Sequence, residues 1–236
     1  MSIKLTDLNN DYMECSNIDE ILDKDNIIIL DCHNINLKSL PNIINFSSLK
    51  ELDCSGNKLT SLPEDMSLVN LEILNCSDNR LTSLPENMCL PSLKEFYCSD
   101  NRLTHFPETM YLPNLEELYC RNNILIKLPD NMSFGSLKVF YCSNNNLIRL
   151  PDNMSLPSLK EFYCSWNNLK SVPDNMNFPK LNTFNVDYNS LTSFPENMSF
   201  PNLEFFSCKG NKLIKLPQWL IKCPKLSRIL YDCISF

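Results

Sequence analysis

Apolar residues recur along the chain with a period of 22 residues. Counted from a leucine at position 1, each unit carries further apolar residues at positions 4, 6, 11 and 14. A constant period of this length indicates a repeat architecture in which every unit is one structural module. We expect nine units over residues 27–216, with caps at 1–26 and 217–236. The marker leucines are Leu49, Leu71, Leu93, Leu115, Leu137, Leu159, Leu181 and Leu203.

The first part of each unit predicts a short strand. Positions 4 and 6, for example Leu74 and Cys76, are apolar and alternate with polar residues at positions 3, 5 and 7. This period of two is typical of a strand that buries one face. We therefore expect one short parallel strand per unit.

An asparagine at position 9 follows each strand. Its amide donors and carbonyl acceptor suit a buried bend, where backbone groups otherwise lack partners. We interpret these residues as a structural ladder and not as ligand contacts. They are Asn57, Asn79, Asn101, Asn123, Asn145, Asn167, Asn189 and Asn211.

Proline at position 15 opens the return path of the unit, and most units have a second proline near position 21. Two prolines so close exclude a long helix and favour a single helical or 3₁₀ turn. An acidic residue follows the first proline, near the positive end of the turn, and a methionine at position 18 extends the core. The acidic residues are Glu64, Glu86, Glu108, Asp130, Asp152, Asp174 and Glu196.

Cysteine occupies position 6 in eight units, and Val186 takes its place once. Valine replaces a packing residue and not a ligand, so the pattern favours buried, reduced thiols that pack as small apolar side chains. Side chains that project in parallel do not readily reach the disulfide torsion, and no nearby histidine completes a zinc site. We therefore predict no disulfide and no metal. The cysteines are Cys32, Cys54, Cys76, Cys98, Cys120, Cys142, Cys164 and Cys208.

The N-terminal segment is expected to cap one end of the stack, which would otherwise expose a bare core. Residues 1–26 contain a faint echo of the repeat at Leu5 and Leu8. A segment that can begin a short helix follows, with Ser16 or Asn17 as its N-cap.

The C-terminal segment is expected to cap the other end. Residues 217–223 are more helical in character than any earlier return path, and a last strand starts at Leu226, one residue late. We expect Trp219 and Phe236 to seal the core there.

The charge of the chain narrows the class of partner. The net charge is −7 and the isoelectric point is near 4.9, with no basic run. Long-range attraction to nucleic acid or to anionic membranes is therefore absent. The N-terminal residues contain no apolar signal core, and no later stretch is long enough to span a bilayer. These features predict a cytoplasmic protein that binds neither nucleic acid nor membrane.

Catalytic residues do not come together in this pattern. His33 and His105 stand at positions 7 and 13 of different units, which face different sides of the repeat. With three glycines, the chain has no glycine-rich phosphate loop. The sequence predicts a protein without enzymatic activity and without a cofactor.

The unit Leu71-x-x-Leu74-x-Cys76-x-x-Asn79-x-Leu81 resembles the leucine-rich repeat family, with cysteine in place of the third leucine. The resemblance covers nearly the whole chain. It implies an α/β-type solenoid with a curved parallel sheet on the concave face and short 3₁₀, extended or one-turn segments on the convex face. The repeat wording Leu-Pro-Glu-Asn-Met-Ser-Leu-Pro-Ser-Leu-Lys looks like that of uncharacterised leucine-rich repeat proteins of giant DNA viruses such as mimivirus, which implies a protein made in an infected cytoplasm.

In such an architecture, positions 3, 5, 7 and 8 line the concave sheet, and they vary while the frame does not. Four tyrosines at position 5 are predicted to form a stripe, flanked by charged and aromatic residues. Large aromatics and arginine dominate protein interfaces. The alternative is that the tyrosines only stack on one another as a structural ladder copied by duplication. The candidate residues are Tyr97, Tyr119, Tyr141, Tyr163, Arg121, Trp166, Tyr188, Glu95, Glu117 and Glu161.

Two functions from different classes follow from these observations. The first is a scaffold for protein-protein interaction that binds through the concave face and is monomeric. Charges of both signs on that face favour a protein partner over a polyanion. The second is a structural or self-assembling protein, of the kind found in virions, without a dedicated ligand.

Overall fold

The computed structural model describes residues 2–15, 17, 20–21, 23–40, 46–66, 68–130, 132–174 and 176–232. The chain divides into two compact halves, the first unit (Met1–Leu115) and the second unit (Glu116–Phe236), and each is described by itself. Each 22-residue module within them is called a repeat. Both are built from short strands joined by turns and extended segments, with 3₁₀ helices only near the chain ends within the described residues. This arrangement confirms the predicted repeat solenoid, in which each repeat adds one strand.

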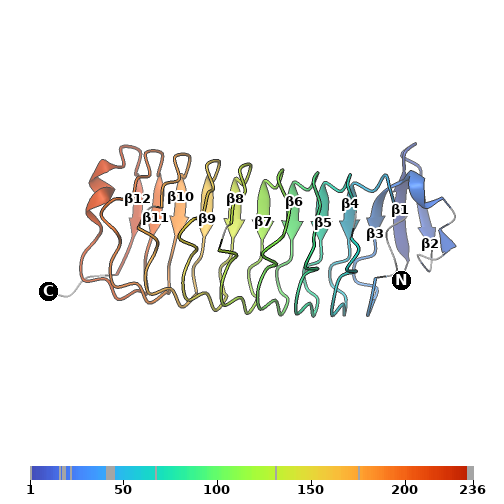
Figure 1. Ribbon diagram of the computed structural model, residues 1–236, viewed down its shortest axis with the longest axis horizontal. Helices are drawn as coiled ribbons and strands as arrows, with labels where there is room; N and C mark the ends of the chain where they lie inside the picture. The colour runs from blue at the N-terminus through green and yellow to red at the C-terminus, as the bar shows by residue number, and fades with distance from the viewer. Residues whose placement is uncertain are drawn as a thin grey trace. The chain divides into compact units, whose positions relative to one another are not determined.

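The first unit contains one sheet in the order β2-β1-β3-β4-β5-β6. The strands from β3 onward pair in parallel, whereas β1 pairs antiparallel with both β2 and β3 (Figure 1). A single 3₁₀ turn, η2 (Lys24–Asn26), leads into β3. The strands are β1 (Ile3–Asp7), β2 (Tyr12–Cys15), β3 (Ile27–Asp31), β4 (Glu51–Asp53), β5 (Ile73–Asn75) and β6 (Glu95–Tyr97).

The second unit contains parallel strands in the order β7-β8-β9-β10-β11-β12 (Figure 1). Its last return path forms the 3₁₀ helix η3 (Gln218–Lys222). This helix confirms that the segment is more helical than the earlier return paths. The strands are β7 (Glu117–Tyr119), β8 (Val139–Tyr141), β9 (Glu161–Tyr163), β10 (Thr183–Asn185), β11 (Phe205–Ser207) and β12 (Arg228–Leu230).

The register of the strands follows the 22-residue period. Leu118 lies beside Phe140, and Phe140 lies beside Phe162, so equivalent positions form columns across the sheet. Position 4 is fully buried in each of these strands, while positions 3 and 5 are half-buried on the other face. The period-two prediction is confirmed, and it fixes which side chains reach solvent.

The asparagines at position 9 form the predicted ladder. Nδ2 of Asn79 donates to the carbonyls of Cys54 and Cys76 at 3.0 and 3.1 Å. Oδ1 of Asn79 accepts a hydrogen bond of 2.9 Å from the backbone N–H of Leu59. One amide side chain thereby satisfies backbone groups of two adjacent repeats, which otherwise would be buried without partners.

The return paths contain tight turns and no long helix. The backbone N–H of Met88 donates to the carbonyl of Pro85 at 3.2 Å, and Met132 does the same to Pro129. Both methionines are buried, so the proline turn directs them into the core. The single turn predicted after position 15 is confirmed.

In each of the two units, the cysteines of position 6 form a buried column on the inner side of the strands. All eight are at most 2% exposed, and Val186 in the same column is fully buried. The eleven cysteines in the described residues are free thiols. Burial raises the pKa of Cys32 and Cys208 to about 12, because a thiolate is poorly solvated there. The column therefore consists of neutral thiols that pack as apolar side chains.

The N-terminal segment differs from the repeat echo expected at Leu5 and Leu8. Strands β1 and β2 form an antiparallel hairpin, and β1 lies against β3 with Leu5 beside Leu30. Leu5 is buried, but Leu8 is exposed in the turn that follows β1. The expected helix start falls partly on residues outside those described, including Ser16.

The C-terminal end of the second unit is closed by Trp219. Its ring is 1% exposed and makes edge-to-face contacts with Phe194, Phe200 and Phe206 at centroid distances of 6.0, 5.1 and 5.3 Å. The prediction for Trp219 is therefore confirmed, while Phe236 lies outside the described residues. None of the helices in the described part of the chain is long and apolar enough to cross a membrane.

Candidate functional site

Three of the predicted tyrosines form a stacked column on the outer sheet face of the second unit. Tyr119, Tyr141 and Tyr163 occupy the same register position of β7, β8 and β9. The ring centroids of Tyr119 and Tyr141 are 5.0 Å apart with an angle of 15° between planes, and those of Tyr141 and Tyr163 are 4.1 Å apart with an angle of 12°. Parallel strands place equivalent side chains about 4.8 Å apart, which is a stacking distance for rings. We call these three residues the tyrosine column.

The hydroxyl groups at two ends of the column donate to glutamates on the same strands. Tyr119 Oη donates to Glu117 Oε2 at 2.9 Å, and Tyr163 Oη donates to Glu161 Oε2 at 3.2 Å. The donor and acceptor share a face because they are two residues apart in a strand.

Both of these tyrosines have a raised pKa. Burial is the largest cause for Tyr119 and for Tyr163. The carboxylates of Glu117 and Glu161 add to it, because a phenolate beside a carboxylate is disfavoured. Tyr119 and Tyr163 are therefore neutral at physiological pH, and their hydroxyl groups lie in a negative potential.

The fourth predicted tyrosine lies in the first unit. Tyr97 occupies the last position of β6, and its hydroxyl donates to Glu95 Oε2 at 2.7 Å. The pair repeats the arrangement of Tyr119 with Glu117. A continuous stripe that joins Tyr97 to the tyrosine column stays a prediction.

The residues at position 7 lie beyond the tyrosine column in the direction of the strands. Arg121 is exposed two residues after the end of β7. Ser165 Oγ donates to Ser143 Oγ at 2.9 Å. The carboxylate of Asp187, also at position 7, accepts a hydrogen bond of 2.6 Å from Ser207 Oγ at position 5 of the next repeat. This row is polar and carries charges of both signs.

Trp166 and Tyr188 form a second aromatic stack next to the column. Their centroids are 4.1 Å apart with an angle of 17° between planes, and they are 56% and 45% exposed. Both have left-handed backbones, with φ of 55° and 50°. Such backbones cost on the order of 1 kcal/mol or more in bulky residues. At the same position, other repeats have asparagine, aspartate or glycine, which tolerate this backbone better.

Gly210 follows Tyr188 in the same series of positions and makes room for its ring. A Cβ atom on Gly210 would lie 2.4 Å from Cδ1 of Tyr188, and the glycine φ is +65°. The left-handed backbone at position 8 therefore determines where the exposed aromatic pair lies.

A cluster that the sequence did not single out lies on the sheet face of the first unit. Asp31, His33 and Asp53 present ligand atoms within 4.8 Å of one another, so the set has the chemistry to hold a divalent cation. The oxygens are also used by the backbone, because the N–H groups of His33 and Ser55 donate to Asp31 and Asp53 at 3.1 and 2.9 Å. The sequence does contain a signal for this cluster, because aspartate stands at position 5 of two successive repeats and histidine at position 7 of the first of them.

The surroundings of this cluster are acidic. The pKa of Glu51 is raised by partial burial and then by the nearby carboxylates of Asp53, Asp31 and Glu95. Like charges disfavour ionisation of a carboxyl group between them. The sheet face of the first unit is thus more negative than that of the second, where Arg121 and Lys209 accompany the acids.

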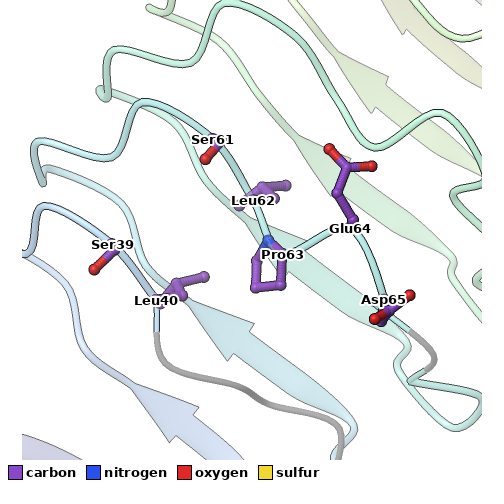
Figure 2. Close-up of a pocket in the computed structure, with 7 residues that line it drawn as sticks. All are labelled: Ser39, Leu40, Ser61, Leu62, Pro63, Glu64 and Asp65. Atoms are coloured by element: carbon purple, nitrogen blue, oxygen red, sulfur yellow. The ribbon is translucent and has the colours of Figure 1, made fainter.

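A shallow hollow lies between two return paths of the first unit. Figure 2 shows Ser39 and Leu40 from one path and the segment from Ser61 to Asp65 from the next. Leu40 and Leu62 are buried beneath it, while Glu64 and Asp65 are exposed. The lining consists of two serines, two leucines, one proline and the two exposed carboxylates of Glu64 and Asp65.

Parallel strands at a 22-residue offset, joined by an asparagine ladder, define a repeat protein of the solenoid class. Part of this chain is similar to the family models of leucine-rich repeats. "Leucine Rich repeats (2 copies)" matches residues 69–108 and 91–131, and "Leucine Rich Repeat" matches residues 48–68. No curated protein matches the sequence closely enough to count as a relative.

Solved structures are similar to a larger part of the chain. YopM, a leucine-rich effector protein from Yersinia pestis, is 31% identical with a TM-score of 0.69, over 84% of this chain and 52% of that one. The functional domain of InlJ from Listeria monocytogenes, which includes a cysteine ladder, is 22% identical with a TM-score of 0.58, over 89% of this chain and 54% of that one.

A third structure is an octameric complex of Latrophilin 3, Unc5D and FLRT2 (LRR). The matching chain is 21% identical with a TM-score of 0.68, over 86% of this chain and 66% of that one. The chain thus spans about half to two thirds of the length of these three structures. At identities of 21% and 22%, the InlJ and FLRT2-complex structures support the fold alone.

Proposed function

We propose that the chain is a non-enzymatic scaffold that binds a protein partner through the outer sheet face of its second unit. The observation that carries the proposal is the tyrosine column, which is half-buried and lies on the variable face of an otherwise regular frame. Tyrosine combines a large apolar ring with a hydroxyl group at low entropic cost, which suits it to the centre of an interface.

The size of the aromatic surface supports a protein partner. A fully covered tyrosine or tryptophan buries roughly 150–250 Å², so the column and Trp166 supply several hundred Å² even when half exposed. A standard interface uses about 800 Å² per partner. The aromatic residues thus provide the centre of an interface, with Arg121 and the serines at position 7 at its edge.

The comparisons support the class of function. Leucine-rich repeat proteins commonly act in protein-protein interaction, and the similar structures include an effector protein and a multiprotein complex. A cytoplasmic location, a monomeric state and the absence of nucleic acid, membrane and cofactor from the binding event belong to the same proposal. So does an origin in a giant DNA virus, in which case the partner is a host protein.

Site-specific photocrosslinking tests the proposal in cells of the source organism. A benzophenone amino acid is placed at Ser143, on the sheet face beside the column, or at Asp152, exposed on the return path of the same repeat. We expect one dominant cross-linked protein from Ser143 and none from Asp152. Its loss in the triple variant Tyr119→Ala, Tyr141→Ala, Tyr163→Ala, with the unfolding midpoint recorded as a control, would place the tyrosines in the contact. Equal cross-linking from both positions, or no effect of the triple variant, contradicts the proposal.

A second candidate function follows from the ring contacts within the column. Because Tyr141 stacks on both of its neighbours, the column also stabilises the sheet without any partner. A structural protein that assembles with copies of itself is consistent with this arrangement. Light scattering over a range of concentrations distinguishes the two, since assembly requires a molecular mass that increases with concentration.

A further inference from the structure

One line of side chains next to the tyrosine column has an acid at each end and an apolar residue between them. The register places Glu117 beside Val139 and Val139 beside Glu161, on three adjacent parallel strands. The two glutamates are two strand spacings apart, or about 9.6 Å between their backbones. Val139 is short, so the space above it is bounded by a carboxylate on either side.

The two carboxylates have no cation as a partner in the described part of the second unit. Their hydrogen bonds come from the neutral hydroxyls of Tyr119 and Tyr163. One position earlier along the strands the situation is different, because Glu116 pairs with Lys138 at 2.5 Å. In the described part of the second unit, Glu117 and Glu161 are therefore half-buried acids without a positively charged partner.

The tyrosine hydroxyls lie in the negative potential of the same two glutamates. The pKa of Tyr119 is raised by Glu117 and also by the more distant Glu161, in addition to burial. A positive group in this space would be attracted by both carboxylates in a partly desolvated setting, where charge-assisted hydrogen bonds are stronger than in water.

We propose that the space above Val139, between Glu117 and Glu161, binds the guanidinium group of an arginine in the protein partner. This inference rests on the proposed function and names the chemistry of the central contact. A guanidinium is planar and carries donors on several edges, so it can pair with a carboxylate on each side at about 2.8 Å. An ammonium is a compact charge and pairs well with only one of the two. The aliphatic stem of the arginine lies over Val139 and the edge of the tyrosine column.

Peptide titration monitored by ¹H-¹⁵N NMR tests the site on the full chain. The probe is acetyl-Gly-Gly-Arg-Gly-Gly-amide, and its twins carry lysine or citrulline, the latter with the shape of arginine but no charge. We expect shifts at the amides of residues 117–119, 139–141 and 161–163. We also expect binding about 10-fold weaker for citrulline and several-fold weaker for lysine, with affinity falling as salt rises.

Variants of the two glutamates test whether these residues contact the arginine peptide. Glu117→Gln and Glu161→Gln keep the hydrogen-bond acceptor for tyrosine but remove the charge, and each should weaken the arginine peptide about 5- to 10-fold. Asp152→Asn removes an exposed acid from the return path and should leave binding unchanged. Equal effects of all three variants would reveal general charge attraction and overturn the site.

A variant that fills the space keeps the proposal testable if the glutamine variants are unstable. Val139→Arg places a guanidinium between the two acids of the same molecule, and it should raise the unfolding midpoint and abolish peptide binding. Val139→Gln has a similar reach without charge and should do neither. If the arginine peptide binds Val139→Arg as well as it binds the unaltered chain, the site is wrong.

The outcome separates this inference from the proposed function. Cross-linking from Ser143 that persists while the arginine and citrulline peptides bind equally overturns the arginine site and leaves the partner-binding face intact. If Ser143 gives no cross-link and the arginine and citrulline peptides also bind equally, the proposed function is overturned as well.

Discussion

The side-chain oxygen of Asn145 accepts a hydrogen bond of 3.0 Å from the backbone N–H of Leu125, 20 residues earlier in the chain. The amide nitrogen of the same side chain donates to the carbonyls of Cys120 and Cys142 at 3.0 and 3.1 Å. One asparagine therefore joins two repeats through buried backbone groups. Each repeat depends on its neighbour for these bonds, and the sheet face that carries the tyrosine column depends on both.

Asn145→Ala should lower the free energy of unfolding by about 2–4 kcal/mol. The buried N–H of Leu125 loses its acceptor, and the carbonyls of Cys120 and Cys142 each lose one of two asparagine donors. Asn146→Ala is the matched control, since the side chain of Asn146 is exposed, and it should change stability by less than about 0.5 kcal/mol. Urea unfolding followed by circular dichroism measures both. Equal midpoints for the two variants would contradict the structural role of the ladder.

The buried thiols predict a loss of stability in alkali. The folded pKa of Cys32 and Cys208 is about 12, against an ordinary value of 9.0. The stabilisation is therefore complete below pH 9 and is lost as the pH rises from 9 towards 12, because the unfolded thiols release protons and the folded ones do not. The urea midpoint should fall steeply over that range.

Cys142→Val provides the control for the thiol effect. Val186 fills the same column in the natural sequence, so the change should cost less than about 1.5 kcal/mol at pH 7. Above pH 9, the free energy of unfolding of this variant should fall less steeply, by up to about 1.4 kcal/mol per pH unit, since one titrating group is removed. An unchanged slope would show that other groups cause the loss.

Gly210→Ala should disturb the exposed aromatic pair. The new Cβ would lie 2.4 Å from the ring of Tyr188, and alanine disfavours the backbone φ of +65°. We expect a loss of about 1–2 kcal/mol in stability and a change in the near-ultraviolet circular dichroism of the Trp166 and Tyr188 stack. At Gly135 nothing lies within 4 Å of an added Cβ, so Gly135→Ala should leave both signals unchanged.

Trp219→Ala should remove about 3–5 kcal/mol of stability, because the ring fills the end of the core against three phenylalanines. The indole N–H has no hydrogen-bond partner in the described residues. Trp219→Phe should therefore cost much less, since only volume is lost. Ile221, which is 87% exposed, gives the control variant Ile221→Ala. Similar losses for phenylalanine and alanine at residue 219 would mean that the indole nitrogen has a role the packing does not explain.

The repeat frame could be predicted from the sequence because its determinants are local and periodic. The apolar positions, the asparagine and the proline of each unit recur every 22 residues, and each has one physical role that its side-chain chemistry suggests. The burial of Cys76, the bonds of Asn79 and the turn at Pro85 all followed from this pattern. The variable positions, including Tyr119, Tyr141 and Tyr163, could be assigned to one face by the same reasoning.

Contacts between residues far apart in the sequence were decided by the tertiary structure. The hairpin that places Leu5 beside Leu30 reverses the chain, and a repeat echo does not signal an antiparallel pairing. The approach of His33 to Asp53, and the stacking of Trp166 on Tyr188, depend on the spacing of adjacent repeats and on local backbone angles. The sequence by itself determined which side chains are inside and which face solvent, because a side-chain period reports burial. Only the folded chain decided which exposed groups meet and which charges stay unpaired, because strand register and backbone twist set distances that a one-dimensional pattern does not contain.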